Sequence, residues 1–250
     1  MNHDGWALGR RRPTPAGKDR REAATVIVSP HLDDAVLSCG RYLAATPETT
    51  VITVFAGSKK DPSTLTQWDQ MCGFQPGQDV MAARRQEDRR ALDLLGAISI
   101  PLEGLDREYR SGPPDMPKLV AWVTDKLAAL RPAEVMVPLG LYHEDHKHAS
   151  DVAIRATAAA GYKQCVVYGD WYHATKPELI EPRVAEITEQ FGPLADITRR
   201  QGSRWSKRQA ISRYRSQLKG MGDNVHRWGS RIEERYWSLA LPPSAELGDL

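Results

Sequence analysis

Residues 24–34 read ATVIVSPHLDD, a nearly continuous apolar run followed at once by polar and titratable side chains. A short β-branched run of this kind is typical of a parallel strand that helices cover on both faces. The next segment, residues 35–45 (AVLSCGRYLAA), has the apolar spacing of a helix. The stretch therefore predicts a strand, then His31, Asp33 and Asp34 at its end, then a helix.

The same alternation of strands and helices continues along the chain. Further strands are expected at residues 49–56, 97–102, 134–139 and 164–168, and helices at 80–95, 117–130, 147–160 and 203–218. This repeat predicts an α/β fold with a single doubly wound, mostly parallel, Rossmann-like sheet that is flanked by helices. We expect one domain over residues 23–241, between a basic mobile tail (1–22) and a loose C-terminal tail (242–250).

The composition is that of a globular protein and excludes several classes of function. The 250 residues are 41% hydrophobic and 26% charged, and their net charge of +2 is too small for a dedicated nucleic-acid binder. Residues 1–22 are basic (6 − 3 = +3) but lack the apolar run of an export signal. Cys39, Cys72 and Cys165 form no Cys-x-x-Cys pair, which favours a reducing compartment and hence the cytoplasm.

Two segments with titratable side chains follow predicted strands and are the candidates for a reactive site. The first is residues 29–34 (SPHLDD), and the second is residues 140–148 (GLYHEDHKH), after the strand at 134–139. In an open parallel sheet, ligands bind beyond the carboxyl ends of the strands, where the strand order reverses. We therefore expect the two segments to meet.

The residue types and their spacing indicate a metal site. A hydrolytic zinc site takes three protein nitrogen or oxygen ligands and leaves one position for water. His31 and Asp34 are three residues apart at a helix start and so share one face. Asp33 points elsewhere, which suits a base that takes a proton from the water. His143 and His146 repeat the spacing, and one of them would complete the site.

Purely structural roles are the alternative for these residues. An aspartate at a helix start is common for capping and dipole reasons, and histidines at 143, 146 and 148 could be solvated side chains of a charged helix start. Two such clusters at strand ends that the fold brings together favour the metal site. Asp145 or Glu144 would then hold the far nitrogen of an imidazole and fix its tautomer.

At these residues the chain resembles the zinc-dependent de-N-acetylases of the PIG-L/LmbE type. The two family signatures read approximately Pro-His-Pro-Asp-Asp-Glu and His-x-Asp-His. They stand here as Pro30-His31-Leu32-Asp33-Asp34-Ala35 and His143-Glu144-Asp145-His146. The likeness extends to residues 84–96 (RRQEDRRALDLLG) and to a late segment between Lys207 and Gln217.

The resemblance implies a role for each matching residue. It implies three ligands for Zn²⁺, or for Fe²⁺ in the cell: His31, Asp34 and His146. It implies three residues with catalytic roles: Asp33, His143 and Asp145. Asp33 would be the general base, and His143 would stabilise the tetrahedral intermediate or protonate the leaving amine. Asp145 would orient a histidine.

Four further residues are candidates for contact with a substrate: Arg84, Asp106, Tyr142 and Trp171. Arg84 could reach a hydroxyl or phosphate, Asp106 follows a strand at the same crevice, and Trp171 could stack on a pyranose ring. The family's tyrosine two residues before the first histidine is Leu141 here, so Tyr142 does not inherit its oxyanion role. Leu32 and Ala35 also depart from the signature, at positions that are neither ligands nor base.

We therefore expect a metal-dependent hydrolase that uses a zinc-bound water to remove an N-acetyl or related N-acyl group from an amino sugar or glycoconjugate. One alternative is an amidase for a thiol-sugar conjugate or a non-sugar amide. Another is a nucleotide-binding Rossmann transferase, which is disfavoured because Asp33 and Asp34 stand where a phosphate-binding turn has glycines. The expected partner is the N-acetylated substrate, with neither nucleic acid nor a membrane span.

Overall fold

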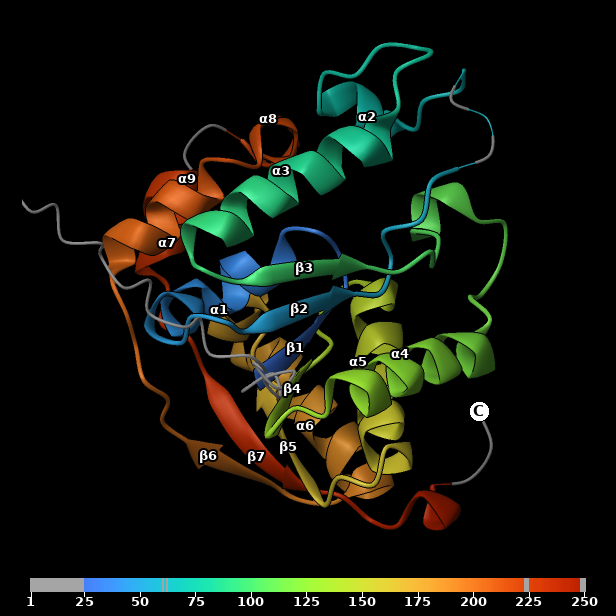
Figure 1. Ribbon diagram of the computed structural model, residues 1–250, viewed down its shortest axis with the longest axis vertical. Helices are drawn as coiled ribbons and strands as arrows, with labels where there is room; N and C mark the ends of the chain where they lie inside the picture. The colour runs from blue at the N-terminus through green and yellow to red at the C-terminus, as the bar shows by residue number, and fades with distance from the viewer. Residues whose placement is uncertain (1–24, 60, 62, 223–224, 248–250) are drawn as a thin grey trace, which may run out of the picture.

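A computed structural model of the protein describes residues 25–59, 61, 63–222 and 225–247. In this part of the chain, seven strands form one sheet in the order β3-β2-β1-β4-β5-β7-β6 (Figure 1). Their bounds are β1 Thr25–Ser29, β2 Thr50–Thr53, β3 Ile98–Pro101, β4 Glu134–Pro138, β5 Gln164–Tyr168, β6 Leu194–Ile197 and β7 Tyr236–Ala240. Strands β1 to β5 are parallel, and β7 runs antiparallel to both β5 and β6. The predicted doubly wound, mostly parallel α/β sheet is confirmed.

Helices cover both faces of the sheet (Figure 1). One face is covered by α1 (Asp34–Ala45), α3 (Val80–Leu94) and α7 (Arg204–Ile211), and the other by α4 (Met116–Leu130), α5 (Glu144–Ala159) and α6 (Pro177–Phe191). The shorter helices are α2 (Gln67–Met71), α8 (Arg215–Met221) and α9 (Val225–Trp228). The single 3₁₀ turns are η1 (Arg107–Tyr109), η2 (Trp171–Thr175), η3 (Gly229–Arg231) and η4 (Ser244–Glu246).

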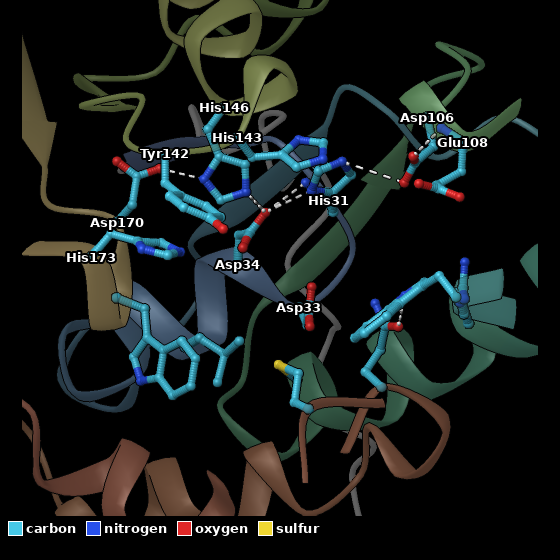
Figure 2. Close-up of a pocket in the computed structure, with 16 residues that line it drawn as sticks. His31, Asp33, Asp34, Asp106, Glu108, Tyr142, His143, His146, Asp170 and His173 are labelled. Atoms are coloured by element: carbon cyan, nitrogen blue, oxygen red, sulfur yellow. Dashed lines mark hydrogen bonds and ion pairs between the residues drawn. The ribbon is translucent and has the colours of Figure 1, made fainter. Parts of the chain in front are cut away.

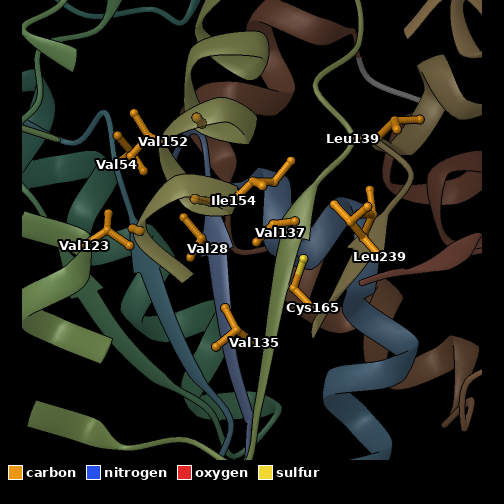
Figure 3. Close-up of a cluster of buried hydrophobic side chains, with 14 of the residues drawn as sticks. Val28, Val54, Val123, Val135, Val137, Leu139, Val152, Ile154, Cys165 and Leu239 are labelled. Carbon is orange, nitrogen blue, oxygen red and sulfur yellow. The ribbon is translucent and has the colours of Figure 1, made fainter. Parts of the chain in front are cut away.

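The core explains why the first strand is apolar throughout. Val26 and Val28 pack in the cluster beneath α4 and α5, part of which Figure 3 shows, whereas Ile27 packs in the cluster beneath α1 and α3. Because side chains alternate between the faces of a strand, burial on both faces requires apolar residues at consecutive positions.

Two expectations for the C-terminal part differ from the structure. The helix expected at 203–218 is broken into α7 and α8. Hydrogen bonds to the buried Asp88 and the half-buried Glu87 of α3 stabilise the break: the Tyr214 hydroxyl donates to Asp88 Oδ1 at 2.8 Å, and Ser216 N donates to Glu87 Oε1 at 3.0 Å. Of the tail expected at 242–250, the described part carries η4, and Leu247 is buried in the core. The tail expected at 1–22 lies outside the described residues.

Helix α1 contains a kink that a distant side chain stabilises. Cys39 has non-helical backbone angles (φ −123°, ψ 18°). The carboxylate of Glu234 accepts hydrogen bonds from Arg41 N (2.8 Å) and Tyr42 N (3.1 Å) just after it. The Lys207 ammonium donates to the same carboxylate at 2.7 Å, and both side chains are buried. A side chain inserted into the helical hydrogen-bond ladder is a known cause of such kinks.

Two findings bear on the environment of the protein. Cys39, Cys72 and Cys165 are buried free thiols, while the cytoplasmic location itself stays a prediction. None of the helices in the described residues combines the length and apolarity that crossing a bilayer requires.

Candidate active site

From β1 the chain adds β2 and then β3 on one side of the sheet, and β4 and then β5 on the other side of β1. The strand order therefore reverses between β1 and β4. The segments that follow β1 and β4 line one cavity of about 460 Å³ (Figure 2). Except for Asp145, every residue predicted for the site lines this cavity: His31, Asp33, Asp34, Arg84, Asp106, Tyr142, His143, His146 and Trp171. The two segments therefore meet, as expected from the topology.

His31, Asp34 and His146 form the candidate metal site. His31 Nδ1 lies 3.2 Å from Asp34 Oδ2, and His146 Nε2 lies 3.3 Å from the same oxygen. One ligand atom from each side chain lies within 4.8 Å of the others, and Figure 2 shows the three side chains converging. Asp34 Oδ2 also accepts a hydrogen bond from His31 N at 2.9 Å, so the structural role at the helix start is present as well.

The electrostatics of this group favour a cation. Burial lowers the pKa of His146, but Asp34 and Asp170 outweigh burial and raise it to about 10. Burial also opposes the shift at His31, yet Asp106, Asp145 and Asp34 raise its pKa well above the usual value. Two imidazole nitrogens and one carboxylate oxygen in carboxylate-rich surroundings are a donor set that zinc and iron accept. The residues therefore fit a divalent metal.

Each of the two candidate ligand histidines, His31 and His146, has a carboxylate beside its second ring nitrogen, the one that is not next to Asp34. Asp170 Oδ1 lies 2.7 Å from His146 Nδ1, and its other oxygen accepts hydrogen bonds from Gly140 N and Leu141 N at 2.8 and 3.2 Å. Asp145 Oδ2 lies 3.2 Å from His31 Nε2, which supports the positioning role expected for it. Such partners fix the orientation and basicity of ligand histidines. Sequence reasoning missed Asp170, although it lies two residues after β5, a strand that ends at this edge.

Asp33 and His143 line the cavity beside this group. Burial, together with the charge of Asp34, raises the pKa of Asp33 to about 7. His143 is the N-cap of α5, and its Nδ1 accepts a hydrogen bond from Asp145 N at 3.2 Å. For this reason α5 begins at Glu144, three residues earlier than expected. Burial and the nearby His31 lower the pKa of His143, so the ring is neutral at neutral pH with its proton on Nε2.

Residues 26–157, more than half of the 250-residue chain, match the sequence pattern of PIG-L, GlcNAc-PI de-N-acetylase. The chain belongs to the PIG-L family. The matched range contains both signatures and therefore all three residues of the candidate metal site. A search among curated proteins found no match.

Solved structures similar to this PIG-L protein include two at 26% sequence identity and a TM-score of 0.71. One is a triple mutant (Orf2*T) of a deacetylase in the teicoplanin biosynthetic pathway, and the similarity covers 87% of this chain and 98% of that one. The other is the A40926 pseudoaglycone deacetylase Dbv21, with coverage of 89% and 98%. The conserved protein TT1542 from Thermus thermophilus shares the fold at 21% identity and a TM-score of 0.51, with coverage of 88% and 94%.

Three further residues of the PIG-L signatures, Leu32, Ala35 and Glu144, and the nearby His148 are not among the described residues that line the cavity. Leu32 and Ala35, which depart from the signature, are buried in apolar clusters, and neither is part of the described cavity lining. Glu144 forms ion pairs with Arg107 and Arg110, so it does not orient a histidine as one alternative had it.

The four candidates for substrate contact differ in their burial and in the side chains that they contact. The Arg84 guanidinium is buried and donates to Asp69 Oδ1 and to the Tyr109 hydroxyl, both at 3.1 Å. Asp106 Oδ2 lies 3.4 Å from His31 Nε2. Tyr142 is 72% exposed and has a positive φ of 68°. The ring of Trp171 is half-buried in the cavity wall.

Proposed function

We propose that this PIG-L protein is a metal-dependent N-deacetylase that removes an acetyl or related acyl group from the nitrogen of an amino sugar or glycoconjugate. The convergence of His31, Asp34 and His146 in one cavity with Asp33 and His143 carries the proposal. The two structures at 26% identity support it, since both are described as deacetylases, one of them for a pseudoaglycone.

The residues divide the work of amide hydrolysis among themselves. A divalent metal held by His31, Asp34 and His146 would supply the Lewis acidity that activates water and polarises an amide carbonyl. Asp33, a buried carboxylate that lines the cavity, accepts a proton from the attacking water and returns it to the nitrogen of the departing amine. His143 carries its proton on Nε2 and so donates to the amide oxygen as negative charge develops there.

Metal analysis and an acetate-release screen test the proposal together. The purified protein should contain close to one equivalent of zinc or iron, and it should release acetate from N-acetylated sugars or glycoconjugates. His31→Ala should lose both metal and activity. Equal metal in the two proteins, or no metal in either, would contradict the site. Turnover confined to non-sugar amides or to thiol-sugar conjugates would show that the substrate is a different amide.

A further inference from the structure

The cavity has a second wall whose side chains the proposed chemistry does not use. We call it the apolar wall; its members are Leu37, Trp68, Trp171 and Met221. Met221 ends helix α8, and the reddish-brown ribbon of the C-terminal helices runs along the side of the cavity opposite the labelled histidines (Figure 2). Trp171 and Met221 lie outside residues 26–157, the range that matches the family.

The two indole rings of the apolar wall are held in fixed positions. Trp68 Nε1 donates to Gln217 Oε1 at 3.2 Å, and its ring lies on Gly220, where an added Cβ would come within 2.7 Å of Cη2. The Trp171 ring lies on Gly229 in the same way, with 3.0 Å from an added Cβ to Cζ2. Both rings are half-buried and line the cavity. They are thus preformed aromatic surfaces, which lowers the entropic cost of binding a flat apolar group.

The charges in the cavity disfavour an anionic substrate group. Five carboxylates line it, and a divalent metal in the proposed site would offset only part of their negative charge. They are Asp33, Asp34, Asp106, Glu108 and Asp170. Among the described lining residues, Arg84 is the one side chain with a permanent positive charge, and Asp69 already pairs with it. Glu108 is an exposed member of the lining, so its negative charge would repel a phosphate in the cavity.

The cavity is large enough to hold more of a substrate than its acetamido group. Its volume of about 460 Å³ falls in the range of about 300–1,000 Å³ that suits drug-sized ligands. We propose that the substrate is an N-acylated amino sugar with an uncharged aromatic aglycone, which lies against the apolar wall. This inference rests on the deacetylase activity proposed above. It also holds that phosphate-bearing N-acyl sugars are poor substrates.

Acetate release from three probes tests the inference: N-acetylglucosamine, 4-nitrophenyl N-acetyl-β-glucosaminide and N-acetylglucosamine 1-phosphate. We expect kcat/KM for the aryl glycoside to exceed that for the free sugar by at least about tenfold, the scale of one aromatic contact. The 1-phosphate should be the poorest of the three. Glu108→Lys should raise kcat/KM for the 1-phosphate several-fold and leave that for the free sugar within about twofold.

Variants of the apolar wall separate aglycone binding from the chemistry. Trp68→Leu and Met221→Glu should each remove most of the aryl preference while turnover of the free sugar changes little. Trp205→Leu is the matched control, because Trp205 is 69% exposed and outside the described cavity lining. Equal rates for the aryl glycoside and the free sugar, a preference for the 1-phosphate, or the same loss in the Trp205→Leu variant would overturn the inference.

A binding measurement keeps the inference testable without turnover. By calorimetry, 4-nitrophenyl β-glucosaminide should bind the native protein at least about tenfold more tightly than glucosamine, and Trp68→Leu should abolish the difference. Failure of every N-acetylated sugar to release acetate would count against the proposed function. In that case equal binding of the two amines would overturn the aglycone site, and selective binding of the aryl amine would uphold it.

Discussion

Asp170 Oδ1 lies 2.7 Å from His146 Nδ1, and this contact leaves Nε2 as the nitrogen of His146 that faces Asp34. The carboxylate is itself held by the backbone N–H groups of Gly140 and Leu141, so the ring is anchored to the turn after β4. The orientation of the third candidate ligand thus depends on a residue that follows a different strand, β5.

We expect Asp170→Asn to weaken metal binding by about 10- to 100-fold, the usual effect of removing the carboxylate partner of a ligand histidine. The amide keeps the shape of the side chain but loses its charge. The dissociation constant for zinc, measured by competition with a chelator, checks the prediction. Asp196→Asn, at an exposed position on β6, is the control, and equal affinities in the two variants would show that Asp170 has no influence on the site.

Asp33 and Asp34 should separate catalysis from metal binding. Asp33→Asn should lower turnover by at least about 100-fold, the scale of a general base, and retain its metal. Asp34→Asn should lose the metal, because its Oδ2 lies within 3.3 Å of a ring nitrogen of both histidines. Metal content and acetate release, measured on the same preparations, check this prediction. If Asp33→Asn lost the metal and Asp34→Asn kept it, the roles of the two residues would be exchanged.

The three histidines near the start of α5 should differ in the same two measurements. His146→Ala should lose metal and activity. His143→Ala should keep the metal and lose activity, because its Nε2–H is the proposed donor to the amide oxygen. His148→Ala should keep most of both, since His148 is outside the described cavity lining. Retention of metal by His146→Ala together with its loss in His148→Ala would refute this order.

The backbone at Tyr142 should be strained. With φ at 68°, it occupies the left-handed region, which costs a residue with a Cβ about 1–2 kcal/mol. Tyr142→Gly should therefore be more stable to urea than Tyr142→Ala by about 1 kcal/mol, although both lose the stacking on His173. At the exposed Ala128 within α4, Ala128→Gly should be destabilising by a similar amount. If Tyr142→Gly is less stable than Tyr142→Ala, just as Ala128→Gly is less stable than the native protein, the backbone at Tyr142 is not strained.

Asp88 should make stability fall as pH rises from about 4 to 7. Burial raises the pKa of Asp88 to about 7, so in this range the folded chain keeps a proton that the unfolded chain has released. In Asp88→Asn this dependence is absent. The free energy of unfolding of the variant, relative to that of the native protein, should therefore increase from pH 4.5 to pH 7, roughly the window between the two pKa values. Asp93→Asn, exposed on the same helix, should show no such trend.

The fold was predictable where the physics is local or periodic. The first five strands are short apolar runs, and their alternation with amphipathic helices is enough to predict a doubly wound sheet. Strands β6 (LADI) and β7 (YWSLA) were missed because they contain one β-branched residue between them. They are strands because β7 pairs with β5 and β6 pairs with β7. The break before α8 depends on Glu87 and Asp88, more than 120 residues away, and has no local signal.

The part of the candidate site that belongs to short motifs with regular residue spacing was predictable from the sequence. His31, Asp34 and His146 belong to two short motifs at strand ends, and the switch in strand order brings these together. Asp170 and Trp68 belong to no motif. Asp170 is a single carboxylate after a strand, and Trp68 lies between the strand predicted at 49–56 and the helix predicted at 80–95. Their places in the cavity follow from tertiary packing alone.

The two hydrogen bonds that Glu234 accepts from helix α1 have a consequence for the evolution and engineering of this chain. Residues 26–157 hold the candidate metal ligands and match the family, yet the helix that starts at Asp34 relies on a carboxylate almost 200 positions downstream for the backbone N–H groups of Arg41 and Tyr42. The matched range is consequently not an autonomous module. Grafting it onto another C-terminal half would require a new acceptor at the kink of α1, with a counter-charge in the place of Lys207.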